Sequence, residues 1–189
     1  MYRGNNPSAM RSREWIREAL IRLLSNQRYA KISIKEICSE ADLSRQTFYQ
    51  IYESKDEIMA YHFECLFLAF KEECADFKDI SIREITTQFF TFFYEEKSFV
   101  KILIENKLTF YLEEMFEQYL PRIDIFKKYN EKEANPDYTI AFVSGALTQI
   151  LIHWFDKDFN LTIDEIARET EETIMARVIG QSIIVSNTN

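Results

Sequence analysis

The sequence predicts an all-α protein of about nine helices, with a three-helix N-terminal head and a larger helical body. Only three of the 189 residues are glycine and three are proline, which disfavours β-hairpins and glycine-rich phosphate-binding loops. Apolar residues recur at spacings of three and four, the period of helices buried on one face. Four capping-box patterns mark helix starts, at Ser33–Glu36, Ser54–Glu57, Ser81–Glu84 and Thr162–Glu165.

Charge is unevenly distributed along the chain. The net charge of −8 by itself disfavours nucleic-acid binding. Through Lys55, however, ten Lys and Arg stand against six Asp and Glu, a net charge of +4, whereas the remainder carries −12. A weakly basic head on an acidic body would turn the head, and not the body, toward a polyanion.

The first helix is expected over residues 11–26, after a mobile tail at residues 1–9. Its arginines are interpreted as solvated charges, with contact to a nucleic-acid backbone as the alternative. The stripe expected to be buried consists of Trp15, Ile16, Ala19, Leu20, Leu23 and Leu24.

Residues 33–56 predict two short helices joined by a tight turn. Ser33 caps the first helix, and Asp42 stands where the chain must turn, since Asp tolerates the left-handed conformation. Ser44 can cap the second helix, with Phe48 and Ile51 on its inner face. This helix–turn–helix can lay its second helix in the major groove of DNA.

The polar residues of this helix, Arg45, Gln46, Thr47, Tyr49 and Gln50, suit that role. Arg can pair with guanine, Gln with adenine, and Tyr and Thr hydroxyls can reach phosphate. The alternative, an ordinary surface helix with a polar face, is equally compatible with the periodicity alone.

The order A-x-L-S-x-x-T-F-Y-x-x-Y-x-S-K-D-E, from Ala41 to Glu57, resembles the DNA-binding domain of the TetR family of transcriptional regulators. The resemblance extends upstream and covers about the first sixty residues. Asp42 stands where the family usually has Gly, and Gln46 where it often has a small residue. The resemblance implies a DNA-binding domain at residues 1–54 and a ligand-binding and dimerisation domain at 55–189. It implies DNA contacts by Ser33, Lys35, Arg45, Gln46, Thr47, Tyr49, Gln50 and Lys55.

The body should begin with a long helix from Lys55 to about residue 77. Further helices are expected at 81–94, 98–105 and 107–119, followed by a charged connector to residue 134. Aromatic residues make up 15% of the chain, and they either form ordinary core or line a pocket for a bulky apolar molecule. The candidates for such a pocket are Tyr61, Phe67, Phe89, Phe93, Phe110, Tyr111 and Phe142.

Two helices are expected at the end of the chain, one capped by Asn135 and one by Thr162. Residues 138–155 contain no charged residue, a length at the lower limit for a membrane span. Scattered polar residues favour instead a helix buried on two sides. The resemblance implies a homodimer through these helices, with Ala141, Ser144, Gly145, Thr148, Ile152, Ile163, Ala167, Thr170 and Ile174 at the interface.

Other function classes receive less support. Three scattered cysteines without a C-x-x-C motif indicate reduced intracellular thiols, and the N-terminus has no apolar signal-peptide core, so a cytoplasmic protein is expected. The sequence shows no catalytic nucleophile, metal-binding or cofactor signature. We therefore expect a homodimeric repressor released from a DNA operator by a small apolar ligand. The alternative is a co-activator or adaptor of the same fold that acts through protein contacts.

Overall fold

The computed structural model describes residues 6–74, 81–123, 127 and 135–186, with side chains described through residue 174. Within these ranges the regular structure is entirely helical, which confirms the predicted class. The α-helices are α1 (Pro7–Leu24), α2 (Ile34–Glu40), α3 (Arg45–Ile51), α4 (Lys55–Glu73), α5 (Ile82–Glu95), α6 (Lys97–Asn106), α7 (Phe110–Tyr119), α9 (Pro136–Asp156) and α10 (Ile163–Ser186). Two 3-10 helices, η1 (Tyr29–Lys31) and η2 (Leu120–Arg122), lie between them.

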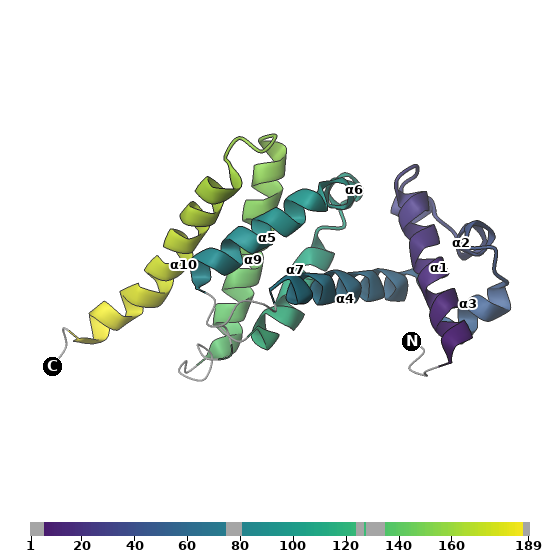
Figure 1. The fold of residues 1–189 in the computed structure, drawn as a ribbon, viewed down its shortest axis with the longest axis horizontal. Helices are drawn as coiled ribbons and strands as arrows, with labels where there is room; N and C mark the ends of the chain where they lie inside the picture. Colours follow the sequence, from purple (N-terminus) through teal and green to yellow (C-terminus); the bar gives the residue numbers. More distant parts are fainter. Residues whose placement is uncertain (1–5, 75–80, 124–126, 128–134, 187–189) are drawn as a thin grey trace.

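The helices form a head and a body that are joined by α4 (Figure 1). In the head, α1 packs against both α2 and α3. α4 contacts α1 at the head and α7 in the body, while α5 packs along α10 and α7 along α9. One continuous cluster of buried apolar side chains runs through both parts, so the head is attached to the body by packing as well as by the chain.

The first helix differs from its predicted bounds. Pro7 occupies its first turn, and the side chain of Asn6 accepts a hydrogen bond from the Ser8 amide at 3.0 Å. Proline and an Asn cap both favour a helix start, so α1 begins within the segment that was expected to be a tail. Trp15 was expected to be buried and is 49% exposed, because the buried stripe is centred on Ile16, Ala19 and Leu20.

The capping boxes are confirmed at three of the four predicted positions. Ser33, Ser81 and Thr162 each accept the amide of the Glu three residues on, and that Glu accepts the cap's amide in return. Ser54 also accepts the Glu57 amide, but the Glu57 carboxylate bonds the amide of Glu53. The fourth pattern therefore forms only half of a capping box.

In the body, one helix start differs from prediction and another lacks its predicted capping hydrogen bond. α7 begins at Phe110 and not at Lys107, because Lys107 has a φ of 58° and ends α6 in the left-handed conformation. Asn135 lies at the cap position of α9, with Pro136 in the first turn as predicted, but its side chain makes no capping hydrogen bond.

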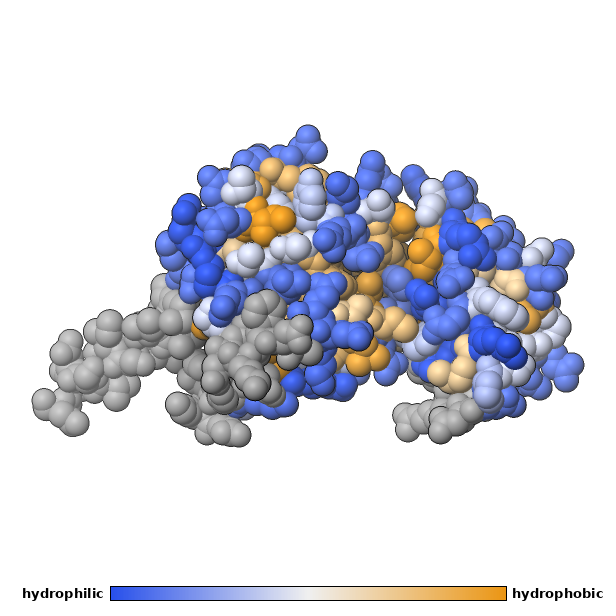
Figure 2. Space-filling view, viewed as in Figure 1, coloured by the Kyte–Doolittle hydropathy of each residue, from blue (hydrophilic) through white to orange (hydrophobic). Residues whose placement is uncertain are grey.

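α9 is the one helix in the described ranges that is long and apolar enough to cross a membrane by length and composition. Its inner face contributes Leu147, Leu151 and Trp154 to the core, and the Trp154 ring packs edge-on against Phe90 of α5. The face of the molecule shown in Figure 2 is mostly hydrophilic, with hydrophobic residues showing mainly in its central part. Within the chain, α9 therefore packs one face into the body and leaves the other exposed, whereas a helix buried on two sides was expected.

Candidate nucleic-acid interface

The turn between α2 and α3 is built by local interactions. Hydrogen bonds from Ser33 to the Glu36 carboxylate fix the start of α2 and lower the pKa of that carboxyl. Asp42 adopts a φ of 53°, which confirms the predicted left-handed turn. The Leu43 amide then donates to the Cys38 carbonyl at 2.9 Å. These bonds set the direction in which α3 leaves α2.

α3 separates its apolar and polar residues cleanly. Phe48 and Ile51 are buried beneath it, together with the following Tyr52. The opposite face exposes Arg45, Gln46, Tyr49 and Gln50, and Tyr49 is 58% exposed. The residues implied to read DNA therefore lie together on one solvent-facing side of the helix.

Thr47 is half-buried at the start of the same helix. Its amide donates to the Ser44 hydroxyl at 3.0 Å, and its own hydroxyl oxygen lies 2.9 Å from that of Ser44. Since the two hydroxyls share a hydrogen bond, Thr47 takes part in the cap of α3. A phosphate contact by Thr47 would have to share this hydroxyl.

Lys55 was expected to bind phosphate, and the structure places its ammonium group inside the head. Nζ donates to the carbonyl oxygens of Tyr29 at 2.7 Å and Ile32 at 3.1 Å, and it lies 4.3 Å from the centre of the Tyr29 ring. Two of its three donors are thus used within the chain. Ser33 and Lys35 are both exposed at the start of α2, and their DNA contacts stay predictions.

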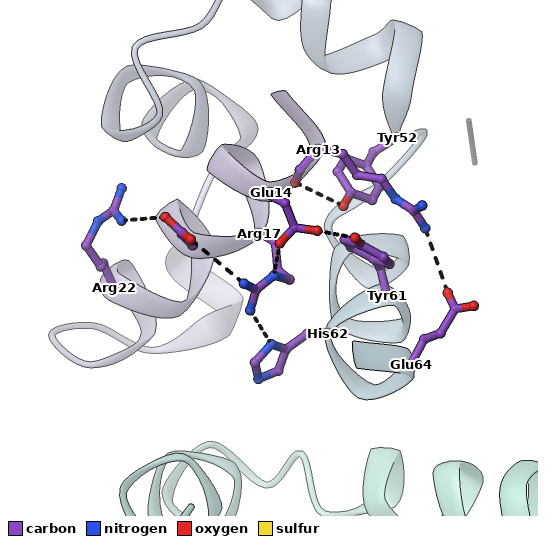
Figure 3. Close-up of polar contacts among 9 residues, drawn as sticks. Arg13, Glu14, Arg17, Arg22, Tyr52, Tyr61, His62 and Glu64 are labelled. Carbon is purple, nitrogen blue, oxygen red and sulfur yellow. Dashed lines mark hydrogen bonds and ion pairs between the residues drawn. The ribbon is translucent and has the colours of Figure 1, made fainter. Parts of the chain in front are cut away.

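α1 and α4 are joined by polar contacts that hold the head on the long helix (Figure 3). The Tyr61 hydroxyl donates to the Glu14 carboxylate, and the Arg17 guanidinium bonds both Glu14 at 2.9 Å and Nδ1 of His62 at 3.0 Å. Arg13 lies over the Tyr61 ring, 3.4 Å from its centre. Tyr61, which was expected to line a pocket, belongs to this contact.

His62 is neutral in this setting. Burial and the neighbouring Arg17 charge lower the pKa of its imidazole to about 3. Because Nδ1 faces a donor, the ring proton lies on Nε2, for which the described residues provide no hydrogen-bond partner.

The body contains a small apolar cavity of about 30 Å³ between α4, α5 and α7. Three of the seven predicted pocket residues line it: Phe67, Phe89 and Phe93. The remaining four lie elsewhere, since Phe110 and Phe142 are largely exposed and Tyr61 and Tyr111 bond carboxylates nearer the head. Prediction missed the other lining residues, which are Leu66 and Phe70 of α4, Phe92 of α5, and Met115, Phe116, Tyr119, Leu120 and Ile123 of α7 and the turn after it.

The small-residue face of α9 was predicted to meet a second chain, but it packs against the chain's own body. An ideal Cβ on Gly145 would lie 3.8 Å from the Glu113 carboxylate of α7, so this face points at the chain's own body. Ser144, Thr148, Ala167, Thr170 and Ile174 are likewise buried within the protomer. Ala141 stays exposed, and Gly145, Ile152 and Ile163 are half-buried. The open side of α9 lies about a quarter turn further round and carries Tyr138, Gln149 and His153.

A second polar cluster joins head and body and was not predicted. The hydroxyls of Tyr29 and Tyr111 both donate to Oδ1 of Asp56, at 2.5 and 2.8 Å. The Tyr29 amide donates to Oδ1 of Asn106 at 2.8 Å. These partners are 27 to 77 residues apart in the chain, so no local spacing could have indicated them.

Comparisons with known proteins support the head and the body separately. Residues 16–61 match the profile described as bacterial regulatory proteins, tetR family. Residues 81–176, half of the chain, match a transcriptional regulator C-terminal region of the same group. No curated protein sequence gave a match.

Solved structures share the fold at low sequence identity. A TetR transcriptional regulator from Streptococcus agalactiae 2603V is 18% identical, with a TM-score of 0.65 over 88% of this chain and 95% of that one. The fatty acid degradation regulator FadR from Bacillus halodurans is 12% identical, with a TM-score of 0.60 over 91% and 96%. The dihydroxyacetone kinase operon activator DhaS is 17% identical, with a TM-score of 0.56 over 88% and 95%. The protein therefore belongs to the TetR family of DNA-binding transcriptional regulators.

Proposed function

We propose that the protein is a homodimeric, sequence-specific repressor that a small apolar molecule releases from its DNA operator. The observation that carries this proposal is the outer face of α3. In the described part of the chain, Arg45, Gln46 and Gln50 are exposed and form no side-chain hydrogen bond or ion pair. Such uncommitted groups can pair with base edges in the major groove.

In this proposal, residues 1–54 form the DNA-binding unit and residues 55–189 the ligand-binding and dimerisation unit. The net charge of +3 in residues 1–54 against −11 in residues 55–189 supports the division, because only the head would be attracted to the phosphate backbone. The exposed Ser33, Lys35 and Tyr49 flank the base-reading residues and would contact phosphates.

A second copy would pack on α9 and α10. The open groove between these helices has a volume of about 450 Å³ and combines apolar Ile150, Leu161 and Ile166 with polar residues at its edges. Pairing through it would place the two α3 helices in successive major grooves of a near-palindromic site.

The proposed dimer has a direct test. Ile150→Glu would place a charge in the groove and should give a monomer in sedimentation. Phe110→Glu, a matched change at an exposed aromatic residue of α7, should leave the dimer intact. A dimer in both variants would exclude this groove as the interface.

The ligand would enter between α4, α5 and α7, where Phe67, Phe89 and Phe93 surround the existing cavity. A volume of about 30 Å³ is far below the roughly 300–1,000 Å³ of ordinary ligand sites. Binding would therefore have to move these helices apart, and α4 continues directly from the DNA-reading head. A ligand that binds only the opened body would shift the protein away from its DNA-binding form.

The structural relatives bear on the ligand and on the sign of regulation. FadR is described as a regulator of fatty acid degradation, which agrees with an apolar ligand in an apolar cavity. DhaS is described as an operon activator, which keeps open the alternative of a co-activator or adaptor that works through protein contacts.

Selection of bound sequences from random double-stranded DNA tests the proposed function. We expect a two-fold symmetric motif, because a dimer presents two reading helices to the DNA. The affinity for this operator should fall steeply with rising salt, because binding neutralises phosphates. Repetition with Arg45→Ala should change the selected bases. An adaptor would yield no enriched motif in either case.

A further inference from the structure

The body contacts the head at a second place besides the α1–α4 packing. We use the term Tyr29 junction for Tyr29, Lys55, Asp56, Asn106 and Tyr111. Tyr29 belongs to η1 in the head, Lys55 and Asp56 to the first turn of α4, Asn106 to the end of α6, and Tyr111 to α7. The junction thus joins one short segment of the head to three helices.

Every hydrogen-bonding group of Tyr29 is used in this junction. Its hydroxyl donates to Asp56 at 2.5 Å, its amide donates to Asn106 at 2.8 Å, and its carbonyl accepts from Lys55 at 2.7 Å. Burial raises the pKa of the Tyr29 hydroxyl, so this group remains a proton donor. With its backbone held at two points and its side chain at a third, Tyr29 cannot shift without breaking a bond.

The body reaches the same carboxylate from the other side. The Tyr111 hydroxyl donates to Oδ1 of Asp56 at 2.8 Å, and its ring stacks on Phe63 with the ring centres 5.8 Å apart. Burial raises the pKa of Tyr111 to about 12, which also keeps it a donor. Asp56 therefore holds one tyrosine of the head and one of the body on the same oxygen atom.

Tyr29 lies shortly before the helix–turn–helix formed by α2 and α3. Two residues, Ile32 and Ser33, separate η1 from the start of α2. The Ile32 carbonyl also accepts from Lys55, and Ser33 caps α2. A movement of Tyr29 is therefore passed to α2 and, through the tight turn, to α3.

We propose that Tyr111 and Asn106 are positioning residues of the body that set the orientation of the DNA-reading head through Tyr29. The inference rests on the proposed DNA-binding function. It adds a connection between α7 and the head that passes through only the first turn of α4, at Asp56. Since Met115, Phe116 and Tyr119 of α7 line the apolar cavity, a ligand that displaces α7 would also pull Tyr111 from Asp56.

The first test is hydrogen exchange on the free, full-length protein. Tyr111→Phe keeps the stacked ring and removes only the hydroxyl. Asn106→Leu removes the acceptor for the Tyr29 amide, and Asn106→Asp restores an acceptor. We expect at least a fivefold rise in amide exchange over residues 29–33 in Tyr111→Phe and Asn106→Leu, with recovery in Asn106→Asp.

The control is Tyr94→Phe, because the Tyr94 ring packs on Trp154 and Phe159 in the body, away from the junction. It should leave exchange over residues 29–33 unchanged. Equal exchange in Tyr94→Phe, Tyr111→Phe and Asn106→Leu would overturn the proposal. This arm needs no DNA, so it remains decisive even if the wild type binds none and the proposed function fails.

The second test uses the operator found by selection, with its half-site spacing shortened or lengthened by one base pair. If the junction sets head orientation, Tyr111→Phe should reduce the wild-type preference for the selected spacing at least fivefold while base preference is kept. Arg45→Ala should change the base preference while the preference for the selected spacing is kept. A uniform loss of affinity at all spacings, or no change, would show a merely structural role for Tyr111 and overturn the proposal.

Discussion

The guanidinium group of Arg17 lies 3.0 Å from Nδ1 of His62, so a charged residue of the head is bonded to a neutral imidazole of α4. The other side of the ring meets Phe99 of α6, with the ring centres 4.4 Å apart. A proton on Nδ1 would turn the hydrogen bond into a repulsion between two cations. The contact between head and body at this place therefore depends on a histidine that stays unprotonated.

This arrangement predicts a loss of stability in acid. The pKa of His62 is about 3 in the folded protein against an ordinary 6.5, so between these values the unfolded chain takes up a proton that the folded chain does not. The free energy of unfolding should fall by about 1.4 kcal/mol per pH unit within that window from this residue alone. Above pH 6.5 the residue contributes no slope.

Urea unfolding of wild type and His62→Asn between pH 4 and 7 measures the effect. Asn keeps an acceptor for Arg17 but does not titrate, so its stability should depend less steeply on pH. His153→Asn, at an exposed position of α9, is the matched control and should follow the wild type. Parallel curves for wild type and His62→Asn would contradict the assignment.

Substitutions on α3 should separate base reading from backbone binding. Arg45→Ala or Gln46→Ala should cost about 1–3 kcal/mol of binding free energy at particular base pairs. Tyr49→Phe should weaken binding to all sequences alike, since a hydroxyl on phosphate carries no base information. Affinities for a panel of single-base operator variants measure both effects. An unchanged sequence preference in Arg45→Ala would mean that α3 does not read the bases.

Substitutions of Lys35 and Lys55 should change the salt dependence of DNA binding differently. Lys35→Ala should reduce the slope of log affinity against log salt by about 1, as expected for a lost phosphate contact. Lys55→Met should lower affinity and stability at an unchanged slope, because its ammonium group bonds the carbonyls of Tyr29 and Ile32. Binding measured at several salt concentrations distinguishes the two. A reduced slope for Lys55→Met would restore the phosphate contact implied by the family resemblance.

The left-handed Asp42 should be replaceable by glycine. Its φ of 53° is strained for a residue with a Cβ, and relief of this strain outweighs the entropy that glycine loses on folding. Asp42→Gly should raise the free energy of unfolding by up to about 1 kcal/mol, and Asp42→Ile should lower it by at least about as much. Chemical denaturation measures both. A destabilised Asp42→Gly would indicate that the Asp side chain contributes an interaction of its own.

Local patterns predicted the elements of the head well. The box at Ser33 and Glu36, the turn at Asp42 and the outward face of α3 all depend on residues within a few positions of one another, and all were found where expected. The bonds that form them span one helical turn, so the order of residues specifies them directly. Errors at this level were small, such as the earlier start of α1 at Pro7.

Arrangements between helices were predicted less well. Periodicity shows that α9 has a small-residue face but not which neighbour covers it, and the structure turns Gly145 toward Glu113 of α7. Aromatic content indicated a pocket, yet Phe67 lines the cavity while Phe110 is 47% exposed. Composition does not specify the rotation of one helix against another, which depends on packing over the whole core.

By itself, the sequence determined an all-helical chain with a helix–turn–helix head, because helix caps, turns and apolar stripes are interactions between near neighbours. The regulator function was indicated by the resemblance of residues 41–57 to the TetR family. Only the tertiary structure decided what Lys55, His62 and Tyr111 bond, and that these bonds tie the head to the body. The partners of these side chains lie on segments distant in the sequence. Which donor or acceptor lies within hydrogen-bonding distance therefore depends on how the helices pack.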